Sequence, residues 1–213
     1  MAPRHTARPP LGRSLALTFF IAIAAAGTSA QDTSRSPLMI GSGRVSIAGS
    51  SNIHEYSAST TVVRITRLQL ASGITGRGLW DEIVKPGAIE SFEIAIPAAS
   101  LSSPKADLDK NMHKALKVQE HPDITFRLLR LVAGDGARGT MNAVGMLKIA
   151  GVEREVTLGL KTASTDAGLS VKGELTLLMT DYGITPPKAM LGMLKTAPKV
   201  TITFETVLTT PLT

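Results

Sequence analysis

The 213-residue sequence contains no cysteine. Disulfides therefore cannot hold the fold together, and its stability must come from its core alone. The same absence excludes lipid attachment at a cysteine, catalysis by a thiol, and metal sites built from cysteine. Histidine is also scarce. Only His54, His113 and His121 lie beyond the first thirty residues, and the spacing of the last two is not that of a known metal site.

Motifs of the common enzyme classes are absent as well. The sequence has no G-x-S-x-G motif and no phosphate-binding P-loop. The segment GITGRG lacks the G-x-G-x-x-G order that binds dinucleotides between a strand and a helix. We therefore expect no catalytic residues, no metal site and no enzymatic activity.

Long hydrophobic runs are missing beyond the first thirty residues. Within the first thirty residues, Arg4, Arg8 and Arg13 precede the uncharged run SLALTFFIAIAAA, which small residues follow. This order is typical of a secretory signal peptide, and the run is shorter than the roughly 20 residues that span a membrane. We predict a cleaved signal peptide over residues 1–30, with a retained anchor as the alternative, and one soluble domain over residues 31–213. The expected location is the bacterial periplasm or the exterior of the cell.

A large excess of charge is absent from the predicted mature chain. The formal net charge of +6 falls to +3 when the three leader arginines are removed. The charge of the predicted mature chain therefore gives little support for nucleic-acid binding. The remaining composition, with 43% hydrophobic and 19% charged residues, is that of one ordinary globular domain.

Period-two alternation is the dominant pattern of the mature chain. In SFEIAIP, for example, Phe92, Ile94 and Ile96 fall on one face of a strand. The pattern predicts about eight strands, in RVSIAG, TTVVRITRLQL, SFEIAIP, ITFRLLRL, MNAVGMLKIAG, EVTLGLK, LSVKGELTLLM and KVTITFETVL. One dry and one wet face per strand suits antiparallel pairing. The pattern fits both a sandwich and a barrel, and a barrel of eight strands is either filled by side chains or wide enough for a small ligand.

One helix is predicted over Leu108–Gln119, with Asp107 as its N-cap. Four residues at helical spacing form its apolar stripe: Leu108, Met112, Ala115 and Leu116. Three lysines share the opposite face: Lys110, Lys114 and Lys117. Pro122 prevents the helix from continuing and favours an extended chain at His121. A second, short helix is predicted after Pro186-Pro187, carrying Met190, Leu191, Met193 and Leu194.

Three segments in this order resemble the YceI-like family: MHKALKVQEHPDITF, GVEREVTLGL and MTDYGITPPKAMLGMLKTAPKVTITFE. The resemblance runs from about Gly41 to Leu208. The opening AGSSNIHEYSAS departs from the family's common pattern. The family consists of bacterial periplasmic proteins with a lipocalin-like barrel that bind polyisoprenoids or similar long-chain amphiphiles. The resemblance thus implies a mainly β fold, an eight-stranded antiparallel lipocalin-like barrel with one or two short helices.

The resemblance also implies an apolar lumen that holds an isoprenoid, quinone-like or fatty amphiphile, with no other cofactor. The residues that we assign to ligand binding are Ile47, His54, Tyr56, Trp80, Phe92, Met112, Leu116, Phe126, Tyr182, Met190, Leu191 and Phe204. His54 and Tyr56, two apart on an extended segment, are candidates for the head group. Structural roles remain as alternatives: a surface pair for His54 and Tyr56, a turn for Tyr182 and core packing for Trp80. The predicted helix over residues 108–119 is either a lid or a plug.

Two functions are compatible with these observations. One is a periplasmic or secreted protein that transports or stores a long-chain lipid. The other is a non-catalytic interaction or stress-response protein, with a filled barrel, that supports a membrane redox partner. The expected partners are the lipid and a transient membrane or membrane redox contact, without nucleic acid. Free β-edges leave a homodimer open.

Overall fold

The structure is a computed structural model that describes residues 37–76, 78–189 and 193–211. All described residues belong to one compact unit, Ser34–Thr213. The predicted signal peptide, Met190 and Leu191 lie outside the described residues. Within the described ranges, no helix is long and apolar enough to cross a membrane.

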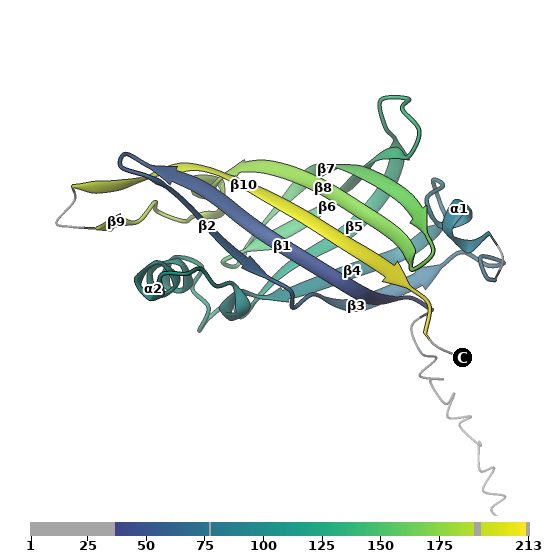
Figure 1. The fold of residues 1–213 in the computed structure, drawn as a ribbon, viewed down its shortest axis with the longest axis horizontal. Coiled ribbons are helices and arrows are strands. Elements are labelled where there is room, and N and C mark those ends of the chain that lie inside the picture. The colour runs from purple at the N-terminus through teal and green to yellow at the C-terminus, as the bar shows by residue number, and fades with distance from the viewer. Residues whose placement is uncertain (1–36, 77, 190–192, 212–213) are drawn as a thin grey trace, which may run out of the picture. The chain divides into compact units, whose positions relative to one another are not determined.

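A single antiparallel sheet makes up most of this unit (Figure 1). Its strands are β1 (Met39–Ser51), β2 (Glu55–Thr60), β3 (Arg64–Leu70), β4 (Ile89–Pro97), β5 (Asp123–Ala133), β6 (Thr140–Ile149), β7 (Val152–Thr165), β8 (Gly168–Leu178), β9 (Lys188–Ala189) and β10 (Leu194–Thr209). The order of neighbours is β2-β1-β10-β8-β7-β6-β5-β4-β3, and β9 pairs with β10. The predicted mainly β, antiparallel fold is confirmed. The predicted count of eight strands is too low, because it omits β2 and β9.

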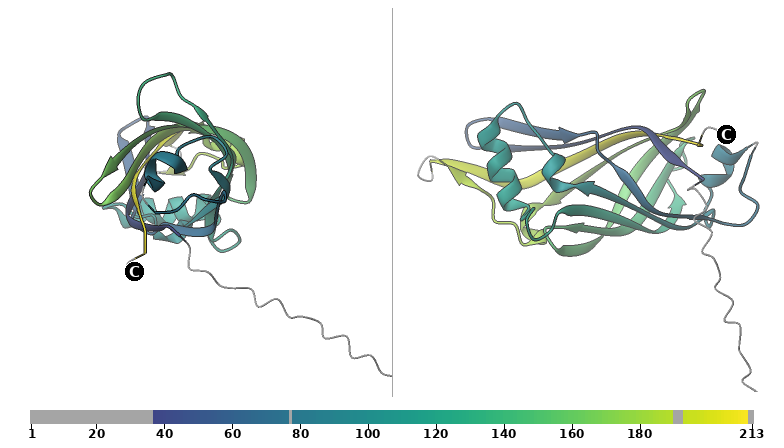
Figure 2. Two further views of the ribbon diagram at one scale, coloured as in Figure 1. Left: turned by 90° about the vertical axis from the view of Figure 1, so that its right-hand side faces the viewer. Right: turned by 90° about the horizontal axis from the view of Figure 1, so that it is seen from below.

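The sheet curls around a central space, as Figure 2 shows in the view along the barrel. Its two edge strands, β2 and β3, are consecutive in the chain and joined by residues 61–63. Thr60 and Arg64 are four residues apart, and four extended residues reach at most about 14 Å. The connection therefore brings the two edges of the sheet together.

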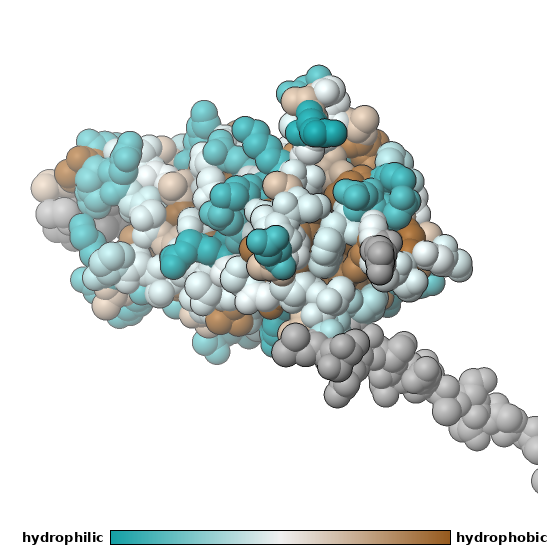
Figure 3. All heavy atoms as spheres, turned by 45° about the vertical axis from the view of Figure 1, so that its right-hand side comes forward, coloured by the Kyte–Doolittle hydropathy of each residue, from teal (hydrophilic) through white to brown (hydrophobic). Residues whose placement is uncertain are grey.

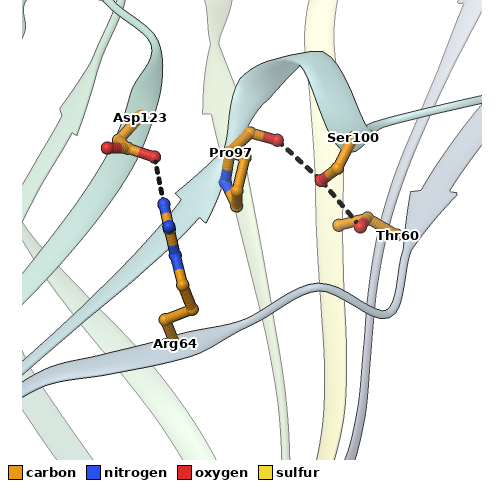
Figure 4. A network of polar contacts seen from close by, with 5 residues as sticks. All are labelled: Thr60, Arg64, Pro97, Ser100 and Asp123. Carbon is orange, nitrogen blue, oxygen red and sulfur yellow. Dashed lines mark hydrogen bonds and ion pairs between the residues drawn. The ribbon is translucent and has the colours of Figure 1, made fainter.

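Polar contacts fasten this junction (Figure 4). Thr60 Oγ1 lies 2.8 Å from Ser100 Oγ, which donates to the carbonyl of Pro97 at 2.6 Å. On the other side, Arg64 Nη2 lies 2.9 Å from Asp123 Oδ1. These contacts connect the ends of β2 and β3 to the chain around β4 and β5, and they hold the barrel closed where the described β2 and β3 form no ladder with each other.

Two α-helices cover opposite ends of the barrel, α1 (Leu79–Ile83) at one end and α2 (Ala106–Ala115) at the other (Figures 1 and 2). Two 3-10 turns also occur, η1 (Ala98–Ser100) and η2 (Met179–Tyr182). Helix α2 is the predicted helix in a shifted position. Its N-cap is Lys105, without a side-chain hydrogen bond, so the prediction of Asp107 as the N-cap is wrong. The Asp109 carboxylate instead accepts a 2.8 Å hydrogen bond from the Ser103 amide, just before the helix.

The end of α2 also differs from the prediction. The helix ends at Ala115, and Lys117 takes a left-handed conformation with φ of 54°, a common way to terminate a helix. The helix therefore ends seven residues before Pro122. As predicted, Lys110, Lys114 and Lys117 are all exposed to solvent.

The second predicted helix is wrong where the structure describes it. The chain after Pro187 forms β9, which pairs antiparallel with the start of β10. Asn52, in the turn between β1 and β2, supplies hydrogen bonds that favour this hairpin. Its partners lie 141 and 143 residues away in the sequence, beyond the reach of local helical spacing.

Candidate ligand-binding cavity

The barrel encloses a cavity of about 900 Å³. Side chains from the inner face of the sheet form most of its wall, and they are almost all apolar. On β5, Leu128 and Leu131 both line it, although they are three positions apart and strict alternation would put them on opposite faces. A register shift between Leu128 and Arg130 inserts an extra residue, which restores the inward face after the bulge. The interior is therefore hollow, not filled by the protein's own side chains.

Two glycines help to keep the lumen open. A Cβ atom on Gly145 would lie 2.6 Å from Phe126 Cε2, and one on Gly173 would lie 2.6 Å from Phe204 Cε1. Each phenylalanine ring thus occupies the space that a side chain on the neighbouring strand would fill. Because glycine has no side chain, the ring lies against the wall instead of across the lumen.

The two ends of the cavity differ in polarity. The lining near α1 is mainly apolar and includes Leu38, Leu68, Ile83, Val84, Ile89, Leu169 and Leu208, with Thr162 and Thr206 as polar members of the same half. The end near α2 has most of the polar lining, from Ser51, His54, Glu55, Tyr56, Ser103, Lys105, Asp107, Asn111 and Thr196. An amphiphile in this cavity would find hydrocarbon at one end and hydrogen-bonding groups at the other.

Helix α2 faces the lumen with its predicted apolar stripe. Leu108, Met112, Ala115 and Leu116 all line the cavity. Leu116, just after the helix, is buried, whereas the other three are only partly buried, since they face open space. His113 Nε2 lies 2.8 Å from the carbonyl of Leu101 and fixes the helix to the chain that leads out of β4.

The comparisons with known proteins agree with this architecture. The family model of the YceI-like domain matches residues 46–208. The chain belongs to the YceI-like family. The comparison with curated proteins gives no match.

Solved structures show the same fold at low sequence identity. A polyisoprenoid binding domain from Saccharophagus degradans, implicated in plant cell wall breakdown, has a TM-score of 0.60 at 12% identity, over 83% of this chain and 100% of that one. Burkholderia cenocepacia BcnA has a TM-score of 0.59 at 15% identity, over 79% and 96%. A Campylobacter jejuni YCEI protein has 0.51 at 13%, over 77% and 85%. At these identities the likeness establishes the lipocalin-like fold only.

Most of the residues predicted to bind a ligand surround the cavity of this YceI-like domain. Those in its lining are Ile47, His54, Tyr56, Phe92, Met112, Leu116, Phe126, Tyr182 and Phe204. Their contact with a ligand stays a prediction. Trp80 is not part of that lining; it packs against a second apolar cluster with Leu79 and Ile83, at the α1 end. Its position agrees with the alternative of core packing.

The candidate head-group residues lie at the α2 end. Tyr56, on β2, covers Gly49 of the neighbouring β1 and is half-buried, and burial raises the pKa of its hydroxyl. It is therefore a neutral hydrogen-bond donor at physiological pH. The neighbouring His54 is exposed, and its backbone, not its ring, bonds to Ser51.

Tyr182, in η2, is only 2% exposed, and no protein group among the described residues hydrogen-bonds to its hydroxyl. Burial raises the pKa of this hydroxyl, and the neighbouring Asp181 charge adds to the shift, while Arg154 opposes it. A buried hydroxyl without a partner is uncommon because its desolvation is not compensated. Tyr182 is the only buried side chain of the described residues with such an atom.

Several lining residues were not predicted. Ala58 lies on β2, and Ile83 and Val84 lie in and after α1. The alternation of Tyr56, Ala58 and Thr60 is the signal that would have revealed β2, although serine and threonine dominate that segment. Among the described residues, no three side chains of His, Cys, Asp or Glu are grouped as a metal site would require.

Proposed function

We propose that this YceI-like protein binds one long-chain amphiphilic lipid, of the isoprenoid, quinone-like or fatty class, inside the barrel. The observation that carries the proposal is the cavity of about 900 Å³ with an almost wholly apolar wall. A volume of this size is at the upper end of the range for small-molecule sites. The printed name of the Saccharophagus degradans domain, polyisoprenoid binding, supports the same ligand class.

The size of the cavity sets the scale of the ligand and its affinity. At about 30 Å³ for each water-sized group, the lumen holds roughly thirty heavy atoms. At roughly −0.3 kcal/mol per heavy atom, such a ligand binds with about −9 kcal/mol, which is a sub-micromolar dissociation constant. Apolar contact with the wall is therefore sufficient for useful affinity without a dedicated polar motif.

The distribution of polar groups orients the ligand. The hydrocarbon chain extends towards the apolar α1 end, and the head group stays at the α2 end, near His54, Tyr56 and Asn111. A buried chain with its head at a polar mouth satisfies both parts of an amphiphile. The expected setting is the periplasm or the cell exterior, where the protein transports or stores the lipid, in accordance with the predicted signal peptide.

Organic extraction of protein purified from its native host, followed by mass spectrometry, tests the proposal. We expect a long-chain lipid in a near-stoichiometric amount. Leu128→Asp, which places a charge in the lumen, should remove the lipid, because burying an unpaired charge beside hydrocarbon is costly. Leu129→Asp is the matched control, since the adjacent Leu129 is 44% exposed and not part of the cavity wall. A lipid-free extract from the unmodified protein would contradict the proposal.

A further inference from the structure

The most exposed large hydrophobic side chains of the described residues are Met193, 68% exposed, and Ile53, 60% exposed. Met193 precedes β10 in the β9–β10 hairpin, and Ile53 lies in the β1–β2 turn. Most of the outer wall in view in Figure 3 is hydrophilic or intermediate, with apolar residues in small separate patches. Two such exposed side chains on neighbouring loops therefore need an explanation.

Hydrogen bonds hold the two loops together. Asn52 Nδ2 donates to the carbonyl of Met193 at 2.9 Å, and the Lys195 amide donates to Asn52 Oδ1 at 2.8 Å. The Asn52 amide also donates to the carbonyl of Lys195 at 3.1 Å. Ile53 and Met193, next to these bonds in the sequence, thus belong to one surface, which we call the apolar tip (Ile53 and Met193).

The apolar tip is at the polar end of the cavity. Ser51, His54 and Glu55, from the same turn as Ile53, line the cavity, and so does Thr196 of β10. Figure 1 shows this turn and the β9–β10 hairpin at the end of the barrel that also has α2, opposite α1. A surface that covers the apolar tip would therefore be close to the α2 end of the cavity, where the head group is proposed to lie.

The β9–β10 hairpin of the apolar tip is basic. The segment from Tyr182 to Phe204, which includes the hairpin, contains three lysines and no acidic residue, and it lies between Asp181 and Glu205. Two of them, Lys195 and Lys199, are exposed. Glu55 is an exposed acidic residue in the adjoining turn. Exposed apolar side chains beside lysines match an anionic bilayer, since the apolar groups enter the lipid while the lysines attract the head groups.

From these observations we infer that the apolar tip docks the protein on the surface of an anionic phospholipid bilayer, with the mouth of the cavity next to the membrane. Docking at this end would let a lipid pass between bilayer and lumen with little exposure of its chain to water. The contact itself does not require a filled lumen. Its failure is therefore distinguishable from failure of the proposed lipid binding.

Co-sedimentation with lipid vesicles tests the inference. The protein, purified after expression of the full chain, is mixed with phosphatidylcholine vesicles, with or without phosphatidylglycerol as a minor component. We expect binding to the vesicles that contain phosphatidylglycerol, weaker binding without it, and a decrease as salt is raised. Ile53→Ser and Met193→Ser should each weaken binding about tenfold, because each removes one inserted apolar side chain.

Matched controls separate docking through the apolar tip from nonspecific hydrophobic binding to the vesicles. Leu129→Ser and Met39→Ser also replace exposed apolar residues, 44% and 47% exposed, but on the barrel wall and at the opposite end of β1. They should leave vesicle binding unchanged. Thermal unfolding verifies that every variant is folded.

Three results would overturn the inference. The first is no sedimentation with either vesicle, and the second is an equal loss in the tip variants and the wall controls. The third is a dimer in solution that Ile53→Ser dissociates, which would show that the apolar tip is a dimer interface. Extracted lipid would still support the proposed function in each case.

Discussion

Removing the hydroxyl of Tyr182 should raise the stability of the fold, whereas removing a buried hydroxyl usually lowers it. Removing a buried hydroxyl usually destabilises a protein, because the hydroxyl is usually hydrogen-bonded. Here the hydroxyl is buried and no described protein group bonds to it, so the protein's own atoms do not compensate for its lost hydration. Tyr182→Phe should therefore stabilise the fold. The penalty for an unsatisfied buried polar group is about 1–3 kcal/mol, which sets the upper range of the gain.

Urea unfolding followed by circular dichroism measures this gain in the free energy of unfolding. A thermal unfolding scan provides a second readout, since each 1 kcal/mol corresponds to about 2–4 °C in melting temperature for a domain of this size. Tyr56→Phe is the matched control, since Tyr56 is only half-buried and its hydroxyl is not an unpartnered buried atom; its stability should change little. A loss of 1 kcal/mol or more in Tyr182→Phe would refute the reasoning, because it would show that the hydroxyl has a partner.

The pH dependence provides a second measurement on the same variant. Burial raises the folded-state pKa of Tyr182 above the ordinary value of 10.0. Above that value the unfolded tyrosine loses its proton while the folded one retains it, so the free energy of unfolding falls as pH rises further. Tyr182→Phe removes this contribution. The stability of the variant should therefore decline less steeply above pH 10 than that of the unmodified protein.

Two further predictions concern the wall and the tip of the barrel. Gly173→Ala should lower the free energy of unfolding by about 1–3 kcal/mol and reduce lipid loading, since its Cβ displaces the Phe204 ring from the wall. Gly159→Ala is the control. Its Cβ meets only one atom, at 3.9 Å, so this variant should behave like the unmodified protein. If both glycine variants retain full stability and loading, the ring does not depend on Gly173. Asn52→Ala should speed hydrogen exchange at the Lys195 amide, which loses its acceptor; unchanged exchange there would show that the hairpin holds without Asn52.

The strands that the sequence reveals are those with a clear apolar face. In β4, Phe92, Ile94 and Ile96 alternate with polar or small residues, and all three line the cavity. In β2, the inward residues are Tyr56, Ala58 and Thr60, which give a weak apolar signal. Local pattern therefore finds a strand only when the residues on its inner face are strongly hydrophobic.

The β9–β10 hairpin was missed for a different reason. Met190, Leu191, Met193 and Leu194 follow Pro186-Pro187 at spacings that fit a helix, and local propensity favours that interpretation. The hairpin depends on pairing with the start of β10 and on Asn52, far away in the sequence. Such contacts override local preference and cannot be found from a window of neighbouring residues.

The hollow lumen was also beyond the reach of periodicity. Alternation predicts which residues point inwards, and the inward positions of Ile124, Phe126 and Leu128 agree with the cavity wall. Whether the inward side chains meet at the centre depends on how the sheet curls and on pairs such as Phe204 and Gly173. Family resemblance, not periodicity, suggested a lumen for a ligand.

Direct titration of delipidated protein with an isoprenoid alcohol of about thirty carbon atoms tests the central claim, that the lumen takes up one apolar chain. We predict saturation at about one molecule per chain with a sub-micromolar dissociation constant, and a negative heat-capacity change from apolar burial. Leu128→Asp should abolish this binding and Leu129→Asp should not. Absence of saturable binding by folded, delipidated protein, or equal binding by both variants, would contradict the account.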